Sequence, residues 1–180
     1  MLQRPDGLVW LFRVSGAGLF TIGLIALLGG AGFRINLTPS EPLGLWRIIE
    51  PDRSILVGDL VLVCPPNSDE MREARARGYL HFGLCAGRFA PLIKTVAATS
   101  GQMIEIHGNV RVDGRPLPHS RIEAMDGQGR EMAPHQSGEV PSGTVFLHSD
   151  FPASFDSRYF GPLPVDGILG LAQEVWTYAP

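Results

Sequence analysis

The sequence predicts a mainly β domain with a closed or strongly coiled sheet and a small helical insertion, preceded by one N-terminal transmembrane helix. Three observations predict it. The 22 glycines and 15 prolines among 180 residues favour turns and short strands over a helical bundle. A long uncharged stretch lies near the N-terminus, and short β-rich runs follow it to the end of the chain. The length is typical of one folded domain.

The predicted membrane helix covers residues 14–33, which contain no charged residue. Twenty residues at ~1.5 Å each match the ~30 Å hydrocarbon core of a bilayer. A cleaved signal peptide is the alternative, since residues 29–31 resemble a small-residue cleavage site. Apolar segments of signal peptides usually run about 7 to 15 residues, so the length favours an uncleaved anchor.

Arginines on the two sides of this segment give a small orientation signal. Arg4 and Arg13 precede it and Arg34 follows it, which favours a cytoplasmic N-terminus. We therefore expect a cytoplasmic tail over residues 1–13 and an extracytoplasmic domain over residues 34–180.

The chain beyond the anchor alternates short aliphatic and β-branched runs with turn residues. The dipeptides Gly108-Asn109 and Asp113-Gly114 separate successive runs, which is typical of hairpins. A meander of strands is expected. The predicted strands are residues 45–49, 60–64, 92–97, 103–106, 110–112, 144–148 and 168–178.

Residues 65–91 interrupt the strand pattern and contain one helix signature. Ser68 is a suitable N-cap, acidic residues follow it, and arginines precede Gly78, which can end a helix. We expect a helical insertion on the β core. Residues 121–141 lack periodicity and are expected to form a long surface loop.

Two cysteines, Cys64 and Cys85, bracket the insertion. In an oxidising compartment a bridge between them would close a loop of about twenty residues and contribute ~3 kcal/mol. Two unrelated buried thiols are an equal alternative. The chain has no CxxC motif, and its five histidines show no pair at ligand spacing, so no metal site is expected.

The charges exclude one class of partner and single out one residue. Fifteen basic and 18 acidic residues give a net charge of -3, which makes nucleic acid an unsuitable partner.

Fourteen of the basic residues are Arg, and Lys94 is the single Lys. Lys can lose its proton on desolvation whereas Arg stays protonated, so Lys94 is suited to chemistry that needs a neutral amine.

Strand alternation over residues 92–97 places Leu92, Lys94 and Val96 on one face. On an edge strand Lys94 would extend to solvent. On a buried face desolvation would lower its pKa from ~10.4 toward neutrality and create a general base.

The segment that follows the anchor contains a candidate nucleophile, Ser40. Pro39 and Pro42 on its two sides are expected to hold the backbone extended, and composition alone indicates only a linker. Three segments together resemble the TraF-like branch of the signal peptidase I family, in the family's order and spacing. Residues 36–46 match the nucleophile motif, residues 91–96 the general-base strand, and residues 154–162 the last conserved box. The matched positions of the first motif are Asn36, Thr38, Ser40, Pro42, Gly44 and Trp46.

This resemblance implies a Ser-Lys dyad in which Ser40 is the nucleophile and neutral Lys94 the base. Ser154 would orient the amine, and the oxyanion hole would comprise the Ser40 N–H and the Thr38 hydroxyl. No cofactor or metal is expected.

Other residues of the last box are expected to support the loop. Asp156 and Arg158 would form a structural ion pair, and Asp150 would support the same network. Asp156 is assigned to Arg158 because a carboxylate beside Lys94 would raise the pKa of the amine. Residues 148–152 replace the Gly-Asp-Asn-Arg-Asp run of typical signal peptidases, which points to the conjugative branch.

The resemblance implies a membrane-anchored serine endopeptidase on the periplasmic side of the bacterial inner membrane. Its substrates would be exported precursors such as a conjugative pilin, bound as an added strand, with cleavage or cyclisation as the outcome. The alternatives are a housekeeping signal peptidase, a self-cleaving Ser-Lys repressor-type domain and a catalytically silent β module in a secretion assembly. The anchor and the lack of a DNA-binding module argue against the repressor type.

Overall fold

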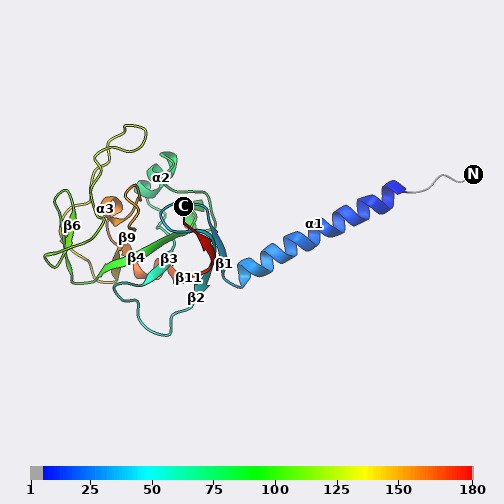
Figure 1. Cartoon of the computed structure of the whole chain (residues 1–180), viewed down its shortest axis with the longest axis horizontal. Coiled ribbons are helices and arrows are strands. Elements are labelled where there is room, and N and C mark those ends of the chain that lie inside the picture. Colours follow the sequence, from blue (N-terminus) through cyan, green and yellow to red (C-terminus); the bar gives the residue numbers. More distant parts are fainter. Residues whose placement is uncertain (1–5, 180) are drawn as a thin grey trace, which may run out of the picture. The chain divides into compact units, whose positions relative to one another are not determined.

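The computed structural model describes residues 6–179, with side chains described from residue 18 onward (Figure 1). The chain divides into two compact units, residues 1–34 and residues 35–180. Each unit is described by itself.

The first unit contains helix α1 (Asp6–Gly30). The helix ends three residues before the predicted bound of 33, and strand β1 (Phe33–Asn36) begins there instead. The Gly32 N–H donates to the Gly29 carbonyl, and Gly32 has a φ of 87°. A glycine in this left-handed conformation ends helices commonly, which explains the earlier end.

No helix in the part of the chain with described side chains, residues 18–179, is long and apolar enough to cross a membrane. The membrane-spanning role of residues 14–33 stays a prediction. Of the expected tail over residues 1–13, the first five residues lie outside the described residues and the rest belong to α1.

The main part of the second unit is a curled seven-stranded sheet (Figure 1). The long C-terminal strand β11 lies between β2 and β3, so the end of the chain pairs with two strands from its first third. The mainly β prediction is confirmed. In sheet order the strands are β1, β2 (Leu43–Ile49), β11 (Ile168–Tyr178), β3 (Leu60–Val63), β4 (Leu92–Thr99), β9 (Thr144–His148) and β10 (Leu163–Pro164).

A second sheet of four short strands continues the chain after β4. Asp113 and Gly114 both have positive φ, 49° and 73°, the geometry of a type I′ hairpin turn. The predicted meander is therefore present, with short strands that the sequence pattern did not predict. In order the strands are β7 (Arg115–Pro116), β6 (Val110–Val112), β5 (Met103–Ile106) and β8 (Gly138–Glu139).

The core lies on both faces of β3 and β4. Val61 and Val63 belong to one buried cluster, while Leu62 packs with Trp46 and Ile93 in another. Both faces of β3 are therefore covered, which explains its continuous apolar run.

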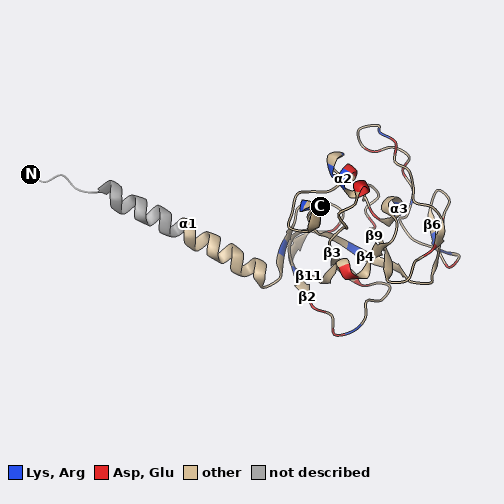
Figure 2. Cartoon of the chain, turned by 180° about the vertical axis from the view of Figure 1, so that it is seen from behind, with Lys and Arg blue, Asp and Glu red and all other residues tan. Residues whose placement is uncertain are grey.

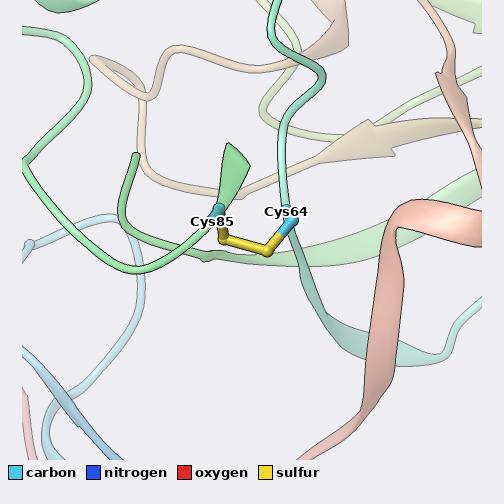
Figure 3. The surroundings of a disulfide bond; sticks show 2 residues. All are labelled: Cys64 and Cys85. Atoms are coloured by element: carbon cyan, nitrogen blue, oxygen red, sulfur yellow. A yellow bond between two sulfur atoms is a disulfide. The ribbon is translucent and has the colours of Figure 1, made fainter. Parts of the chain in front are cut away.

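The insertion over residues 65–91 contains helix α2 (Asp69–Ala76) and the short helix η1 (Ala86–Arg88). Ser68 caps α2 by accepting from the Met71 N–H at 3.2 Å, as predicted. The Cys64 and Cys85 sulfurs are bonded, with their Cα atoms 5.5 Å apart (Figure 3). The bridge joins the end of β3 to the segment before η1.

Three features of the second half of the chain differ from the predicted structure. The loop over residues 121–141 includes β8 and an isolated bridge between Met125 and Glu131. The last box contains a helical turn, α3 (Ser157–Phe160), because the Asp156 side chain caps it. A second short helix, η2 (Val165–Gly167), precedes β11.

Acidic and basic residues are interspersed along the described elements and loops (Figure 2). Among the strands and helices with described side chains, none carries a long run of one sign of charge, in keeping with the small net charge of -3.

Candidate active site

Ser40 lies in a turn between β1 and β2, not in the extended segment that the prolines predicted. The Asn36 side chain closes this turn. Its Nδ2 donates to the carbonyl oxygens of Thr38 at 3.0 Å, Glu41 at 2.9 Å and Pro42 at 3.0 Å. Proline restricts only its own φ and the conformation of the preceding residue. The backbone therefore turns at Ser40 because the Asn36 amide donates to three carbonyl oxygens.

Lys94 is central in the sheet and 2% exposed. Its neighbours on the same face, Leu92 and Val96, pack into the core cluster that contains Val61 and Val63. Lys94 therefore lies on a buried face of the sheet and does not extend to solvent from an edge strand. The Lys94 Nζ donates to the Ser154 Oγ at 2.9 Å. The predicted pairing of these two side chains is therefore present in the structure.

Burial lowers the pKa of Lys94 from 10.5 to about 8. The nearby Asp156 and Glu41 carboxylates act in the opposite direction and raise the pKa, while the Arg158 charge lowers it. Asp156 pairs with Arg158 as expected, and its charge still acts on Lys94. Desolvation nevertheless outweighs both carboxylates, and a substantial share of the amine is neutral near neutral pH.

Asp156 and Arg158 form a fully buried bidentate pair. Arg158 Nε donates to Asp156 Oδ1 at 2.8 Å and its NH2 donates to Oδ2 at 2.9 Å. Burial acts to raise the pKa of Asp156, but the adjacent His148 imidazole and the hydrogen bonds and charge of Arg158 lower it overall. Both side chains are 0% exposed, so the pair serves as a rigid internal support.

Asp150 occupies a more peripheral place than Asp156. Its side chain is 81% exposed, and one oxygen lies 3.7 Å from His148 Nε2. The opposite side of that imidazole, Nδ1, lies 3.4 Å from Asp156 Oδ2. Asp150 therefore reaches the buried pair only through His148, a buried residue that the sequence analysis left unassigned.

The Thr38 hydroxyl lies beside the nucleophile, 3.5 Å from Ser40 Oγ. In this structure it donates to Asn36 Oδ1 at 2.7 Å. A rotation about its Cβ–Oγ bond would turn the same proton toward a substrate oxygen.

Ser40, Lys94 and Ser154 line one cleft of about 620 Å³. Its walls come from the nucleophile turn, the insertion, the first half of β4 and the loop before α3. Most of the wall is apolar, with the side chains of Leu92 and Phe155 among the lining groups. The space suits an extended peptide segment with apolar side chains.

Three residues of this site were not assigned a role from the sequence. Asn36 belongs to the nucleophile motif, Glu41 follows the nucleophile, and Ser149 lies in a segment without a regular pattern. Burial raises the pKa of Glu41, and the Lys94 charge opposes this effect. In the sequence, only their proximity to Ser40 indicates a role for Asn36 and Glu41. No local feature of the sequence indicates a role for Ser149.

Within residues 18–179, whose side chains are described, no three His, Cys, Asp or Glu side chains gather where they could hold a metal ion. The chemistry available in the cleft is that of a hydroxyl, a buried amine and hydrogen-bond donors. Such a set is typical of nucleophilic catalysis by serine with an amine base.

Comparison with known sequences identifies the class. The family profile described as "Signal peptidase, peptidase S26" matches residues 10–177. The chain therefore belongs to the S26 signal peptidases, a family of serine peptidases.

Several relatives specify the similarity further. A "Probable conjugal transfer protein TraF" of Sinorhizobium fredii is 56% identical over 178 residues, covering 99% of this chain and 95% of that protein. A "Conjugal transfer protein TraF" of Agrobacterium tumefaciens is 52% identical over 170 residues, covering 94% and 97%. A "Plasmid transfer protein TraF" of Escherichia coli is 37% identical over 169 residues, covering 91% and 92%. The chain is thus a TraF-like member of the family, as its motifs predicted.

Proposed function

We propose that this chain is a membrane-anchored serine endopeptidase that uses a Ser40–Lys94 dyad to process exported precursor proteins in a conjugative transfer system. The observation that carries the proposal is the state of Lys94. Its amine is buried, its pKa is lowered to about 8, and it lies in one cleft with Ser40. A buried lysine with a lowered pKa in a cleft indicates a general base.

The reaction begins when neutral Lys94 accepts the proton of the Ser40 hydroxyl while Ser40 Oγ attacks the scissile carbonyl carbon. The negative charge on the carbonyl oxygen is stabilised by the Ser40 N–H and by the rotated Thr38 hydroxyl. Lys94 then gives its proton to the leaving amine as the peptide bond breaks, which leaves an acyl-enzyme on Ser40.

A second nucleophile releases the acyl group. Water gives a cleaved product with a free carboxylate, and an amine of the substrate itself gives a cyclic product. Lys94 takes the proton of either nucleophile and returns it to Ser40 Oγ. Mass spectrometry distinguishes the outcomes, because the cyclic product is lighter than the cleaved one by one water.

The proposed location is the periplasmic side of the bacterial inner membrane. The uncharged segment 14–33 supports an anchor, and the bond between Cys64 and Cys85 supports an oxidising compartment. Protease added to spheroplasts should digest the domain, and full protection in intact spheroplasts would contradict this orientation.

The proposed substrate is a pilin precursor. The names of the relatives in Sinorhizobium, Agrobacterium and Escherichia associate those proteins with conjugal or plasmid transfer, and this supports a transfer system over a housekeeping role. An extended substrate would enter the apolar cleft as an added strand.

Covalent labelling tests the proposal. A penem-type inhibitor should acylate Ser40 in the wild-type protein, and mass spectrometry of digested peptides should locate the adduct in residues 36–46. The Ser40→Ala variant should remain unlabelled. Absence of any wild-type adduct under conditions where the protein is folded would favour the silent β module.

A further inference from the structure

The loop over residues 149–156 supplies one serine hydroxyl to each member of the proposed dyad. Near its end, Ser154 Oγ accepts from Lys94 Nζ at 2.9 Å. At its start, Ser149 Oγ donates to the carbonyl oxygen of Ser40. Both serines are buried, at 3% and 0% exposure, so neither contact competes with bulk water.

One ion pair fixes the backbone at both ends of this loop. Asp156 Oδ2 accepts from the Ser149 N–H at 3.2 Å. Arg158 NH2 donates to the Ser154 carbonyl oxygen at 3.0 Å. The carboxylate and the guanidinium are themselves held in bidentate contact, a geometry that leaves little freedom. The positions of the two serines are therefore set by one rigid support.

The Ser149 hydroxyl has a defined direction. It accepts from the Phe151 N–H at 3.3 Å, and this leaves its single proton for the Ser40 carbonyl. The carbonyl belongs to the peptide after Ser40, so this bond fixes the backbone on the C-terminal side of the nucleophile.

The N-terminal side of the nucleophile is fixed separately by Asn36. Its amide oxygen accepts from the Thr38 N–H at 3.1 Å, and its Nδ2 donates to the Thr38 carbonyl. Asn36 thus holds Thr38, two residues before the nucleophile, and Ser149 holds the peptide that follows Ser40. The two side chains together restrict the direction in which Ser40 projects its hydroxyl.

We propose that Ser149 is a positioning residue for Ser40, and that the loop over residues 149–156 is a single brace that aligns the nucleophile with its base. Ser154 places the amine and Ser149 places the residue that carries the hydroxyl. The inference rests on the proposed function, because alignment has a consequence only if Ser40 and Lys94 react together.

If Ser149 positions Ser40, its removal should slow the reaction in a way that the loss of a purely structural serine would not. A displacement of about 1 Å in a reacting group can cost on the order of 100-fold in rate. Ser149→Ala should therefore lower the rate of Ser40 acylation by roughly 10- to 100-fold. Ser149 makes no contact with the titrating amine and influences it only through Glu41, whose pKa it lowers, so the pH midpoint of the reaction should move less than it does in Glu41→Gln.

Ser120 offers a matched control. It is also a buried serine, and its Oγ donates to the Leu117 carbonyl and accepts from the Val110 N–H. Ser120→Ala removes the same kind of contact outside the cleft, and should leave the acylation rate unchanged. Thermal unfolding of both variants shows whether their losses of stability are comparable.

The experiment measures the rate of penem acylation against pH in the wild type, Ser149→Ala, Ser120→Ala and Glu41→Gln. A slow Ser149→Ala protein whose midpoint moves less than that of Glu41→Gln supports the brace. A Ser149→Ala rate equal to that of Ser120→Ala overturns it, and so does a loss of rate explained by a midpoint shift as large as that of Glu41→Gln. Acylation of the wild-type protein leaves the proposed function standing in either case.

Ser149→Thr keeps the inference testable if Ser149→Ala unfolds. It retains the donating hydroxyl and should keep the rate within a few-fold of wild type. A folded Ser149→Thr protein that loses about 100-fold in rate would contradict the role of the hydroxyl.

Discussion

The rate at which Ser40 is acylated should depend on pH through Lys94. Only the neutral amine can accept the Ser40 proton, so the rate should follow the neutral fraction. With a pKa of about 8, the rate should rise about tenfold per pH unit below that value and level off above it.

The magnitude follows from the lowered pKa. At pH ~7 about one amine in ten is neutral, whereas an ordinary lysine with a pKa of 10.5 would be neutral in about one molecule in three thousand. Burial therefore increases the reactive population roughly 300-fold, equivalent to about 3 kcal/mol. This is the gain in neutral amine that the buried face of β4 provides, and the lower basicity of the amine offsets part of it in the rate.

The assay is the second-order rate constant for penem labelling between about pH 6 and about pH 10, with a probe that does not titrate in this interval. Circular dichroism at each pH serves as the control for folding. A midpoint near 10.5, the ordinary value of lysine, would refute the argument from burial. A midpoint near ~6.5 would indicate an imidazole base instead.

The remaining predictions concern the surroundings of the dyad. Glu41→Gln removes a carboxylate that raises the pKa of Lys94, so the acidic limb of the profile should move to lower pH; a move to higher pH would contradict the electrostatic account. Ser154→Ala should lower kcat for a precursor peptide by roughly 10- to 100-fold, and unchanged turnover would mean that Ser154 does not orient the amine. The double variant Cys64→Ser with Cys85→Ser should lose ~3 kcal/mol of unfolding free energy in urea, since its loop spans 21 residues; equal stability to wild type would show that the bridge contributes little.

Local patterns in the sequence predicted much of the sheet. The bounds of β5, β6, β9 and β11 agree with the predicted runs, because each run is bordered by turn residues. Alternation likewise placed Lys94 on the face of Leu92 and Val96. Both successes depend on information within a few residues.

The errors arise where hydrogen bonds from a side chain to the nearby backbone decide the local conformation. The turn at Ser40 is closed by the Asn36 side chain, which contacts carbonyls up to six residues away. The helical turn α3 begins because Asp156 caps it, and the same carboxylate also accepts from Ser149. Strand alternation carries no information about such side-chain to backbone bonds, and the cap preference that identified Ser68 was not applied to Asp156.

In the candidate site, too, the sequence indicated some residues and only the folded structure revealed the others. The motif spacing indicated Ser40, Lys94 and Ser154, and the structure brings all three to one cleft. Ser149 lies 109 residues from Ser40 in sequence, so only the three-dimensional structure relates them. The influence of Asp156 and Glu41 on Lys94 is equally a property of the folded chain.

The central claim is that Lys94 acts as a neutral amine, and Lys94→Arg tests it most directly. Arginine keeps the positive charge and much of the length, but it does not lose its proton at ordinary pH. The measurement is kcat/KM for a precursor peptide, with folding of the variant verified by thermal unfolding. We expect cleavage by Lys94→Arg to fall to the level of Ser40→Ala, whereas near wild-type cleavage would contradict the dyad.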